Sequence, residues 1–521
     1  MKKYIQFDQN DLWLLRAVSS FAESKKVKLY LVGGMLRDLL LDRKEGNPDY
    51  DFCLKKGAIN FGLLLARKIK AGFVVLDKEH GACRLVKPFR LQGSSLVIKG
   101  GSKGRLVEAE GVRDIVYTLD FTDFRGVDIK EDLLHRDFTM NAIAVEFKNA
   151  LIPAAGRKRG SSAGLTQVDL RDMFIDPYGA SKDIKDKRIR AVGKMAFAED
   201  PLRVMRAFSF KASLGFDIDK ETRKLLKKEL NKLPDVSWER IRDELFKIFE
   251  CDSGFGCLLE MDKLGILRII FPEIKKMRGI GRGPYHHLDV WQHTLETIRQ
   301  LELLIKELKR NSQIQVYLNE IISPERTRGA LLKLGAFLHD IGKPSALRYE
   351  DGKTKFHGHE NIGLNMTKEI CRRIKLSNNE INSLKTIVLC HLRPGYLAGI
   401  KELTLRAKFR YFRDTGKEAL SVLLLSIADQ RATKGPYATR ESRERHEKIV
   451  FGLIKEYFRN KKEKKSSRLL NGDDLIRKFK LEPSVLIGKI LSEIEELQAI
   501  GRIKTRQEAF RAAEKFMEAG C

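Results

Sequence analysis

The segment Asp49-Tyr50-Asp51-Phe52 lies shortly after Leu31-Val32-Gly33-Gly34-Met35-Leu36-Arg37-Asp38, and these two stretches decide the fold of the first part of the chain. Apolar and β-branched residues from Lys28 to Val32 predict a buried strand, which Gly33-Gly34 ends before a helical stretch from Met35 to Leu41. A helix N-terminus that follows a glycine turn is well suited to bind phosphate. The pattern therefore predicts a phosphate site beside the acidic segment.

The acidic segment itself predicts a metal site. Asp49 and Asp51 stand two residues apart in an extended stretch, so both carboxylates point to the same face. Two carboxylates on one face need a cation, and Mg²⁺ prefers such oxygen ligands beside substrate phosphates. A phosphate site next to a metal site indicates nucleotidyl transfer. The alternative, a glycine turn followed by a solvated acidic strand end, loses weight once the later motifs are counted.

Strand and helix signals continue to alternate after this segment, which is typical of an α/β fold. The stretches 72–76, 83–86 and 116–121 have β character, and 59–70 has helical character. We expect Asp120, in Leu119-Asp120-Phe121, to lie beside the first pair as a third carboxylate. A strand-end turn residue is the alternative reading, since Asp123 is close by.

The chain is long and strongly basic. Its 521 residues suggest about three or four domains, and a hydrophobic content of 43% supports a sizeable core. The net charge is +29, with a pI near 9.7 and basic residues along the whole length. Such a surface favours a long polyanion, with RNA or DNA as the first expectation. A membrane is not expected, because no stretch approaches the roughly 18 apolar residues of a spanning helix.

Cysteine usage and the first residues favour a cytoplasmic protein. Seven scattered cysteines form no CxxC pair, which favours reduced thiols over a disulfide or zinc-thiolate framework. Polar residues from Gln6 to Asn10 interrupt any apolar signal region after Met1-Lys2-Lys3. Two stretches rich in Gly, Ser and basic residues, 88–113 and 154–164, are read as mobile loops or insertions.

A family resemblance rests on the stretch from Asp132 to Ala144, which reads DLLHRDFTMNAIA. It resembles the RRDFTxNAxA motif of class II tRNA nucleotidyltransferases and bacterial poly(A) polymerases. Gly33-Gly34-x-x-Arg37-Asp38 followed by Asp49-x-Asp51 matches the first motif of that family. His135 departs from the pattern, because the family usually has Arg there.

The resemblance implies that Arg136, Asp137 and Asn141 hold the ribose and triphosphate of the incoming nucleotide. Their chemistry agrees, since a guanidinium suits phosphate while an acid and an amide suit sugar hydroxyls. The full nucleotide-binding set that we expect is Gly33, Gly34, Arg37, Arg136, Asp137, Asn141, Asp200, Arg203 and Arg206.

The base-reading part of that set lies in Glu199-Asp200-Pro201-Leu202-Arg203, which resembles the EDxxR motif of the family. Glu199 and Asp200 before Pro201 predict a helix start, and Asp200 and Arg203 would share a face. The alternative interpretation, which would hold for an isolated D-x-x-R sequence, is a salt bridge within the helix. Ser209 departs from the family, which commonly has Arg at that position, and 238–245 resembles the motif that braces this helix.

An acid beside an arginine complements two of the four bases. Cytosine and adenine both present an amino donor beside a ring-nitrogen acceptor, which match an Asp acceptor and an Arg donor. Guanine and uracil present the reverse polarity, and mismatched buried polar groups exclude them. One residue pair therefore explains selection of C and A without a nucleic-acid template.

A second chemical centre follows in the chain. The stretch from Gly335 to Lys343, with adjacent His and Asp, resembles the HD phosphohydrolase superfamily. The resemblance implies a four-ligand set and a second metal site, and isolated core histidines are the alternative. The four ligands are His293, His339, Asp340 and Asp429, and the second pair is His359 and His391. Imidazole with carboxylate suits Mn, Fe, Co or Ni more than Mg, and paired metals would activate water for attack on a phosphate ester.

The resemblance covers nearly the whole chain and implies an α/β nucleotidyltransferase head of the polymerase β type, followed by all-α neck, HD and C-terminal helical domains. The expected parts are a head at 1–180, a neck at 181–272, an HD domain at 273–450, and a basic linker with a helical tail at 451–521. The tail is predicted as a helical pair, 473–498 and 505–518, that docks on the tRNA elbow or on the HD domain.

The implied activity is Mg²⁺-dependent, template-independent addition of CCA to the 3′ end of tRNA from CTP and ATP. Asp49 and Asp51 would hold metals that align the primer hydroxyl with the α-phosphate and stabilise pyrophosphate. CC-addition, A-addition and poly(A) synthesis stay open as products of the same fold. A more distant alternative is an RNA-associated hydrolase in which the HD centre carries the principal activity.

Overall fold

The computed structural model describes residues 4–5, 9–43, 48–89, 115–148, 168–169, 173–281, 287–350, 353–435, 439–462 and 467–518. The chain forms two compact units, Met1–Asp235 and Val236–Cys521. No helix in the described part of the chain is long and apolar enough to cross a membrane. The expected loop 88–113, apart from its first two residues, and the expected loop 154–164 lie outside the described residues.

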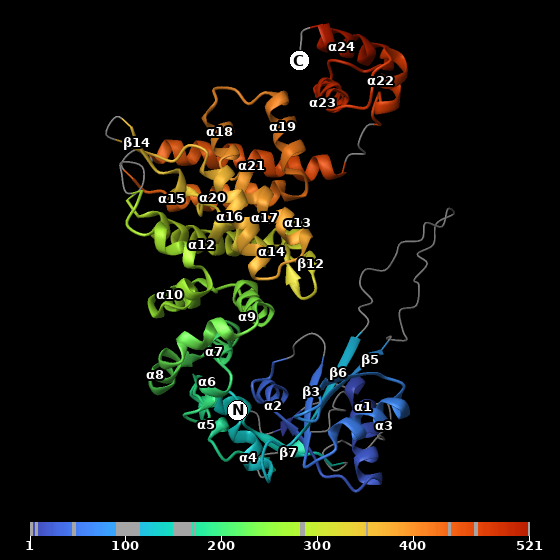
Figure 1. The fold of residues 1–521 in the computed structure, drawn as a ribbon, viewed down its shortest axis with the longest axis vertical. Helices are drawn as coiled ribbons and strands as arrows, with labels where there is room; N and C mark the ends of the chain where they lie inside the picture. The colour runs from blue at the N-terminus through green and yellow to red at the C-terminus, as the bar shows by residue number, and fades with distance from the viewer. Residues whose placement is uncertain are drawn as a thin grey trace. The chain divides into compact units, whose positions relative to one another are not determined.

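The first unit is built on a seven-stranded mixed sheet with the order β4-β5-β6-β3-β2-β7-β9 (Figure 1). Its strands are β2 (Leu29–Val32), β3 (Asp49–Leu54), β4 (Gly72–Asp77), β5 (Ala82–Phe89), β6 (Ile115–Asp123), β7 (Ala144–Glu146) and β9 (Phe174–Ile175). The central pair, β3 and β6, is parallel, and the other neighbours are antiparallel. The predicted strands of the head are confirmed.

One face of this sheet is apolar and carries two helices, α1 (Gln9–Ser24) and α3 (Ala58–Ile69). Phe52 and Phe121 stack at 5.2 Å between ring centroids, and Phe61 of α3 packs on Phe121 at 5.3 Å. Successive side chains of a strand point to opposite faces. Asp49, Asp51 and Asp120 therefore point away from these helices.

The opposite face is partly covered by shorter elements, namely α2 (Gly34–Leu40), α4 (Ile129–Leu134) and the 3₁₀ turn η1 (Thr139–Asn141). The first unit continues with α5 (Ala180–Lys185), β10 (Arg188–Ile189), α6 (Ala196–Glu199), α7 (Arg203–Leu214), β11 (Asp217–Ile218), α8 (Lys220–Lys228) and η3 (Leu230–Asp235). The strands β10 and β11 form a short parallel pair within this otherwise helical part.

The second unit is helical, with α9 (Trp238–Glu250), α10 (Phe255–Leu264) and α11 (Ile266–Ile270) before a larger bundle. The bundle includes α12 (Val290–Glu307), α14 (Arg328–Leu338), α16 (His359–Arg373), α17 (Asn378–Cys390), α20 (Ala419–Ala432) and α21 (Arg440–Lys462). Nearly every residue of α14 and α20 is buried, as expected for helices that are apolar on all sides. Two short strand pairs, 321–323 with 326–327 and 348–350 with 353–355, interrupt the helices.

The end of the chain forms three helices where the sequence predicted two. They are α22 (Gly472–Phe479), α23 (Val485–Ala499) and α24 (Arg506–Glu518), which enclose a core of their own. The prediction of one helix over 473–498 is wrong because the chain turns between α22 and α23. Lys480 adopts a left-handed conformation with φ 54°, and Pro483 cannot continue an α-helix from the preceding turn.

Candidate active site and candidate metal centre

Three carboxylates converge on the polar face of the sheet. Asp49 and Asp51 lie on β3, and the parallel register places Asp120 of β6 directly beside Asp51. One oxygen of each carboxylate lies within 4.8 Å of the others, so the three could hold metal ions. The predicted position of Asp120 beside the first pair is confirmed.

The electrostatics of this cluster fit a bound cation. Burial, together with the nearby charges of Asp49 and Asp120, raises the pKa of Asp51 to about 6, while Arg136 acts in the opposite direction. A carboxylate that resists ionisation in the metal-free protein is stabilised when a divalent cation takes up its charge. Oxygen-only ligands are those preferred by Mg²⁺.

Gly33 brings the backbone close to this cluster. Its φ of 81° lies in the left-handed region, and a Cβ built there would lie 2.8 Å from Nη1 of Arg136 and 3.2 Å from Oδ2 of Asp51. The conformation favours glycine at this position, and a side chain there would displace the end of Arg136. The turn thus joins the first motif, the acidic strand and Arg136 at one point.

A continuous polar network follows from the same turn. Arg37 Nη1 donates to Oδ1 of Asn141 at 2.7 Å, and Asn141 Nδ2 donates to Oδ1 of Asp137 at 2.9 Å. Arg206 Nε then donates to Oδ2 of Asp137 at 2.8 Å. Burial acts to raise the pKa of Asp137, but Arg206 and Asn141 outweigh it and hold the pKa below its usual value. Four residues of the predicted nucleotide-binding set are therefore linked to one another.

Phe210 completes this network, and sequence reasoning missed it. Its ring lies 5.0 Å from the guanidinium carbon of Arg37 and 5.1 Å from that of Arg206. Phe210 lies four residues after Arg206 on α7, so both side chains share one helix face. The spacing of four residues between Arg206 and Phe210 is the sequence signal from which this contact could have been predicted.

The EDxxR segment differs in detail from the prediction. Helix α7 begins at Arg203, and Asp200 is extended, with its Oδ1 accepting a hydrogen bond from the Leu202 amide at 3.1 Å. Helix α7 is thus assigned from two residues after the expected start at Pro201, and Asp200 caps this start, because its carbonyl oxygen also accepts a hydrogen bond from the Arg203 amide at 3.0 Å. The face shared by Asp200 and Arg203 stays a prediction.

Arg203 ties α7 to the second motif. Its Nη2 donates to the carbonyl oxygen of His135 at 2.5 Å, and its Nη1 donates to those of Ala196 at 2.9 Å and Arg136 at 3.2 Å. These carbonyls fix the plane of the guanidinium. His135 also contacts this segment, since its Nδ1 lies 3.3 Å from Oε1 of Glu199.

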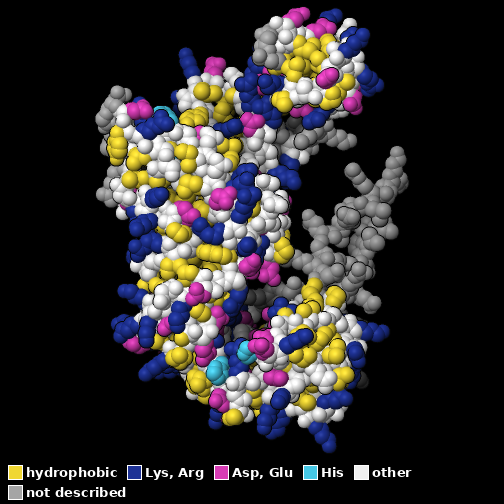
Figure 2. Space-filling view, in the orientation of Figure 1, with side chains coloured by type: hydrophobic (Ala, Val, Ile, Leu, Met, Phe, Trp, Pro, Cys, Tyr) yellow, Lys and Arg dark blue, Asp and Glu magenta, His cyan; other side chains and the backbone are white. Residues whose placement is uncertain are grey.

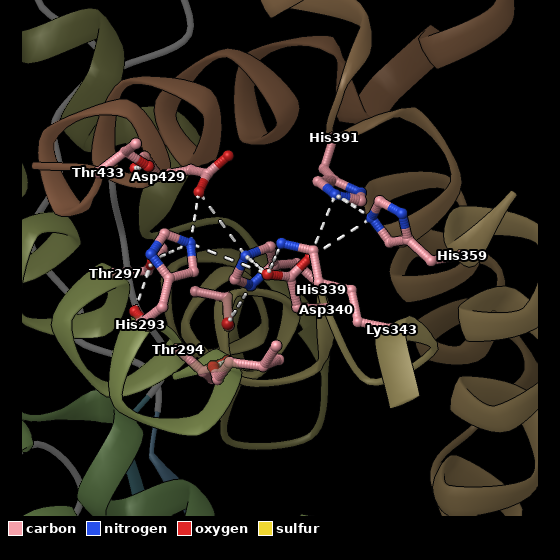
Figure 3. Close-up of polar contacts among 12 residues, drawn as sticks. His293, Thr294, Thr297, His339, Asp340, Lys343, His359, His391, Asp429 and Thr433 are labelled. Carbon is pink, nitrogen blue, oxygen red and sulfur yellow. Dashed lines mark hydrogen bonds and ion pairs between the residues drawn. The ribbon is translucent and has the colours of Figure 1, made fainter. Parts of the chain in front are cut away.

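The second unit brings together all six predicted ligands of the HD motif (Figure 3). One group of three consists of His293, His339 and Asp429, and the other consists of Asp340, His359 and His391. Asp340 lies between the groups, with Oδ2 3.2 Å from Nε2 of His339 and Oδ1 3.4 Å from Nε2 of His359. The expected four-ligand set lies together, since Oδ2 of Asp340 is also 3.8 Å from Nε2 of His293, and Asp340 in addition faces the second pair.

The donor set of this HD centre fits metal ions. The Nδ1 atoms of His339, His359 and His391 lie 2.6 to 2.8 Å from backbone carbonyl oxygens, so each Nε2 is left to face the centre. Nε2 of His339 and both carboxylate oxygens of Asp340 are buried and make no hydrogen bond of good geometry among the described residues, although Oδ2 of Asp340 forms an ion pair with Lys343. Buried nitrogen and oxygen atoms of this kind are satisfied when they bind a metal ion.

The protonation states of the residues in the HD centre also favour metal binding. Burial and the neighbouring His339 and His359 lower the pKa of His391 to about 3, so its imidazole is neutral and able to bind a metal. Lys343 Nζ lies 2.6 Å from Oδ2 of Asp340 and, together with His339, holds the pKa of that carboxyl well below its usual value, so that Asp340 is ionised as a metal ligand must be.

Comparisons with known proteins match the parts of the chain that carry both sites. The poly A polymerase head domain matches residues 29–190, the probable RNA and SrmB-binding site of polymerase A matches 215–277, and the HD domain matches 290–434. The chain thus has the head domain of a nucleotidyltransferase, followed by an RNA-binding region and an HD domain.

Relatives with several product names cover nearly the whole chain. The A-adding tRNA nucleotidyltransferase of Deinococcus radiodurans is 27% identical over 94% of this chain and 95% of its own. The CC-adding enzyme of Geobacter sulfurreducens is 27% identical over 95% and 93%. The Multifunctional CCA protein of Vibrio cholerae is 28% identical over 80% and 90%.

Solved structures show the same fold. The Thermotoga maritima CCA-adding enzyme, complexed with tRNA, is 23% identical and covers 99% of this chain and 100% of its own, with a TM-score of 0.58. A CCA-adding enzyme in complex with CTP is 21% identical with the same coverage and a TM-score of 0.59.

Proposed function

We propose that this protein adds C and A residues from CTP and ATP to the 3′ end of tRNA without a nucleic-acid template. The observation that carries the proposal is the turn at Gly33, where Arg136 and Asp51 of the carboxylate cluster both approach the backbone, followed directly by α2, whose Arg37 begins the polar network with Asn141, Asp137 and Arg206. A metal site and cationic groups for a triphosphate therefore lie together in one unit.

In this proposal Asp49, Asp51 and Asp120 hold Mg²⁺, which when bound stabilises charge on the transferring and leaving phosphates. Arg37, Arg136 and Arg206 receive the triphosphate, because guanidinium groups bind phosphate oxygens in pairs. Asp137 and Asn141 orient the ribose through its hydroxyls.

Selection of C and A is assigned to Asp200 and Arg203. The carbonyl contacts of Arg203 fix its guanidinium plane before a base arrives. Base recognition then uses the remaining N–H groups or exchanges one of these bonds for a bond to the base. Preorganised donors and acceptors lose less entropy on binding.

tRNA is the proposed primer because the relatives named above act on tRNA and the chain is strongly basic. Figure 2 shows Lys and Arg side chains spread over the visible face, which suits a polyanion. CC-addition, A-addition and poly(A) synthesis are the competing products, and the relatives' names include the first two.

Primer extension distinguishes these products. Three tRNA transcripts, ending at the discriminator base, at C and at CC, are each incubated with CTP, ATP or both in the presence of Mg²⁺, beside an Asp49→Ala control. Addition of three residues to the shortest transcript supports full CCA synthesis. A stop at CC, or use of the CC-ended primer alone, identifies a half-enzyme, and unlimited ATP addition identifies a poly(A) polymerase.

A phosphohydrolase activity of the HD centre is the second proposal, carried by the buried ligand atoms of His339 and Asp340. Paired ions there would activate water for attack on a phosphate ester. Purified protein with added Ni²⁺ or Mn²⁺ should hydrolyse a 2′,3′-cyclic nucleotide or p-nitrophenyl phosphate. Failure on both substrates contradicts this second proposal and leaves the first untouched.

A further inference from the structure

A buried carboxylate lies behind the metal site, on the other face of the same sheet. Asp11 of α1 is 7% exposed. Its Oδ2 accepts a hydrogen bond from the hydroxyl of Tyr50 at 2.7 Å, and its Oδ1 accepts one from the hydroxyl of Tyr117 at 3.0 Å. Both tyrosines are fully buried. One side chain of α1 thus joins two strands of the sheet.

These two strands are the ones that carry the carboxylate cluster. Tyr50 lies between Asp49 and Asp51 on β3, so its ring points to the face opposite those carboxylates. Tyr117 lies on β6, one residue before Thr118, which pairs with Asp49. Asp120 follows on the same strand. The hydrogen bonds of Asp11 therefore connect β3 and β6 from behind, next to the residues whose spacing sets the metal site.

We propose that Asp11 is a positioning residue that fixes the spacing of Asp49, Asp51 and Asp120 through Tyr50 and Tyr117. This inference rests on the proposed role of the three carboxylates in nucleotidyl transfer. Metal sites lose affinity when ligand positions relax by a fraction of an ångström. The matched head-domain model begins at residue 29, so α1 contributes to the site from outside it.

The first test removes one hydroxyl at a time in the full-length protein. Tyr50→Phe and Tyr117→Phe should each raise the Mg²⁺ concentration for half-maximal primer extension by about threefold to tenfold, the effect of losing one buried hydrogen bond. Tyr411→Phe is the matched control, because Tyr411 is equally buried and donates to the carbonyl oxygen of Ala419 in the second unit. It should leave the Mg²⁺ dependence unchanged.

A second variant separates positioning from general stability. The triple variant Asp11→Leu/Tyr50→Phe/Tyr117→Phe replaces all three hydrogen-bonding side chains by apolar ones. Replacement of both partners of a hydrogen bond by apolar groups is nearly neutral for stability. The thermal unfolding temperature should return close to that of the unmodified protein, while the half-maximal Mg²⁺ concentration stays raised. Recovery of both quantities would show a purely structural role and overturn the inference.

The outcomes also separate this inference from the proposed function. If Asp49→Ala abolishes transfer but the single hydroxyl variants keep the normal Mg²⁺ dependence, the inference is wrong and the function stands. If the unmodified protein extends none of the tRNA primers, the proposed function is wrong. Mn²⁺ binding measured by electron paramagnetic resonance in an Asp340→Ala background then still tests the inference, since weaker binding in Tyr50→Phe supports it and unchanged binding contradicts it.

Discussion

Arg84 donates two parallel hydrogen bonds, both 2.8 Å long, to the carboxylate of Asp120. Arg84 lies on β5 and pairs directly with Asp120 across the antiparallel ladder. The third carboxylate of the cluster is therefore oriented by a guanidinium on the neighbouring strand. Such a fork-to-carboxylate pair fixes direction as well as charge.

Loss of this pair should reduce nucleotidyl transfer. Arg84→Ala is expected to lower the rate of primer extension at saturating Mg²⁺ by about tenfold, because a charged hydrogen-bonded partner contributes about 1.5 kcal/mol or more. Arg84→Lys should recover little, because an ammonium cannot form the two parallel bonds. Arg67→Ala, which removes an exposed charge from α3, is the control. Full activity in Arg84→Ala would contradict the orienting role.

The raised pKa of Asp51 predicts a pH-dependent stability of the metal-free protein. The folded state holds a proton up to about pH 6, whereas the unfolded chain releases it near pH 4. The contribution of Asp51 to the free energy of unfolding should therefore be greatest below pH 4, fall by about 2 to 3 kcal/mol between pH 4 and 6, and stay level above that.

Asp51→Asn should remove this dependence and, in EDTA at pH 7.5, unfold at a higher temperature than the unmodified protein. The same variant should be inactive in primer extension. Thermal unfolding across pH 4 to 8 measures the first effect. If Asp51→Asn unfolds at a lower temperature than the unmodified protein at pH 7.5, the ionised Asp51 carboxylate does not destabilise the metal-free fold, and the prediction is contradicted.

Phe210 predicts a defect in nucleotide binding. Phe210→Leu keeps an apolar side chain but removes the ring that contacts both Arg37 and Arg206. Two cation–π contacts at about 0.5 to 1 kcal/mol each suggest a rise of about tenfold in the KM for CTP and ATP. Phe210→Tyr should restore the KM, and a loss confined to kcat would argue against a role in aligning the two arginines.

The two centres should be separable by substitution. Asp340→Ala removes the residue that faces both ligand groups of the HD centre, so phosphohydrolase activity with Ni²⁺ or Mn²⁺ should fall below detection. Primer extension should remain within about twofold, because the two centres belong to separate compact units and mutations at sites without shared partners act independently. Asp49→Ala should show the reverse pattern. Loss of both activities in either variant would contradict this separation.

Features carried by local spacing could be predicted from the sequence. The Gly33 turn, the shared face of Asp49 and Asp51, and the adjacent His339 and Asp340 depend on neighbouring residues and on fixed strand or helix periodicities. The strands of the head and its helix 59–70 were predictable for the same reason. One local prediction is wrong, the uninterrupted helix 473–498, since the turn at Lys480 divides it into α22 and α23.

The sequence by itself determined which residue types carry the chemistry, and the tertiary structure decided how they are held. The bonds from Asp11 to Tyr50 and Tyr117 span 39 and 106 residues, and the pairing of Arg84 with Asp120 depends on strand order and register. The position of Asp340 between two ligand groups depends on how separate helices pack. Periodicity specifies the face on which a side chain lies, but only the packing of distant segments specifies which side chain it meets.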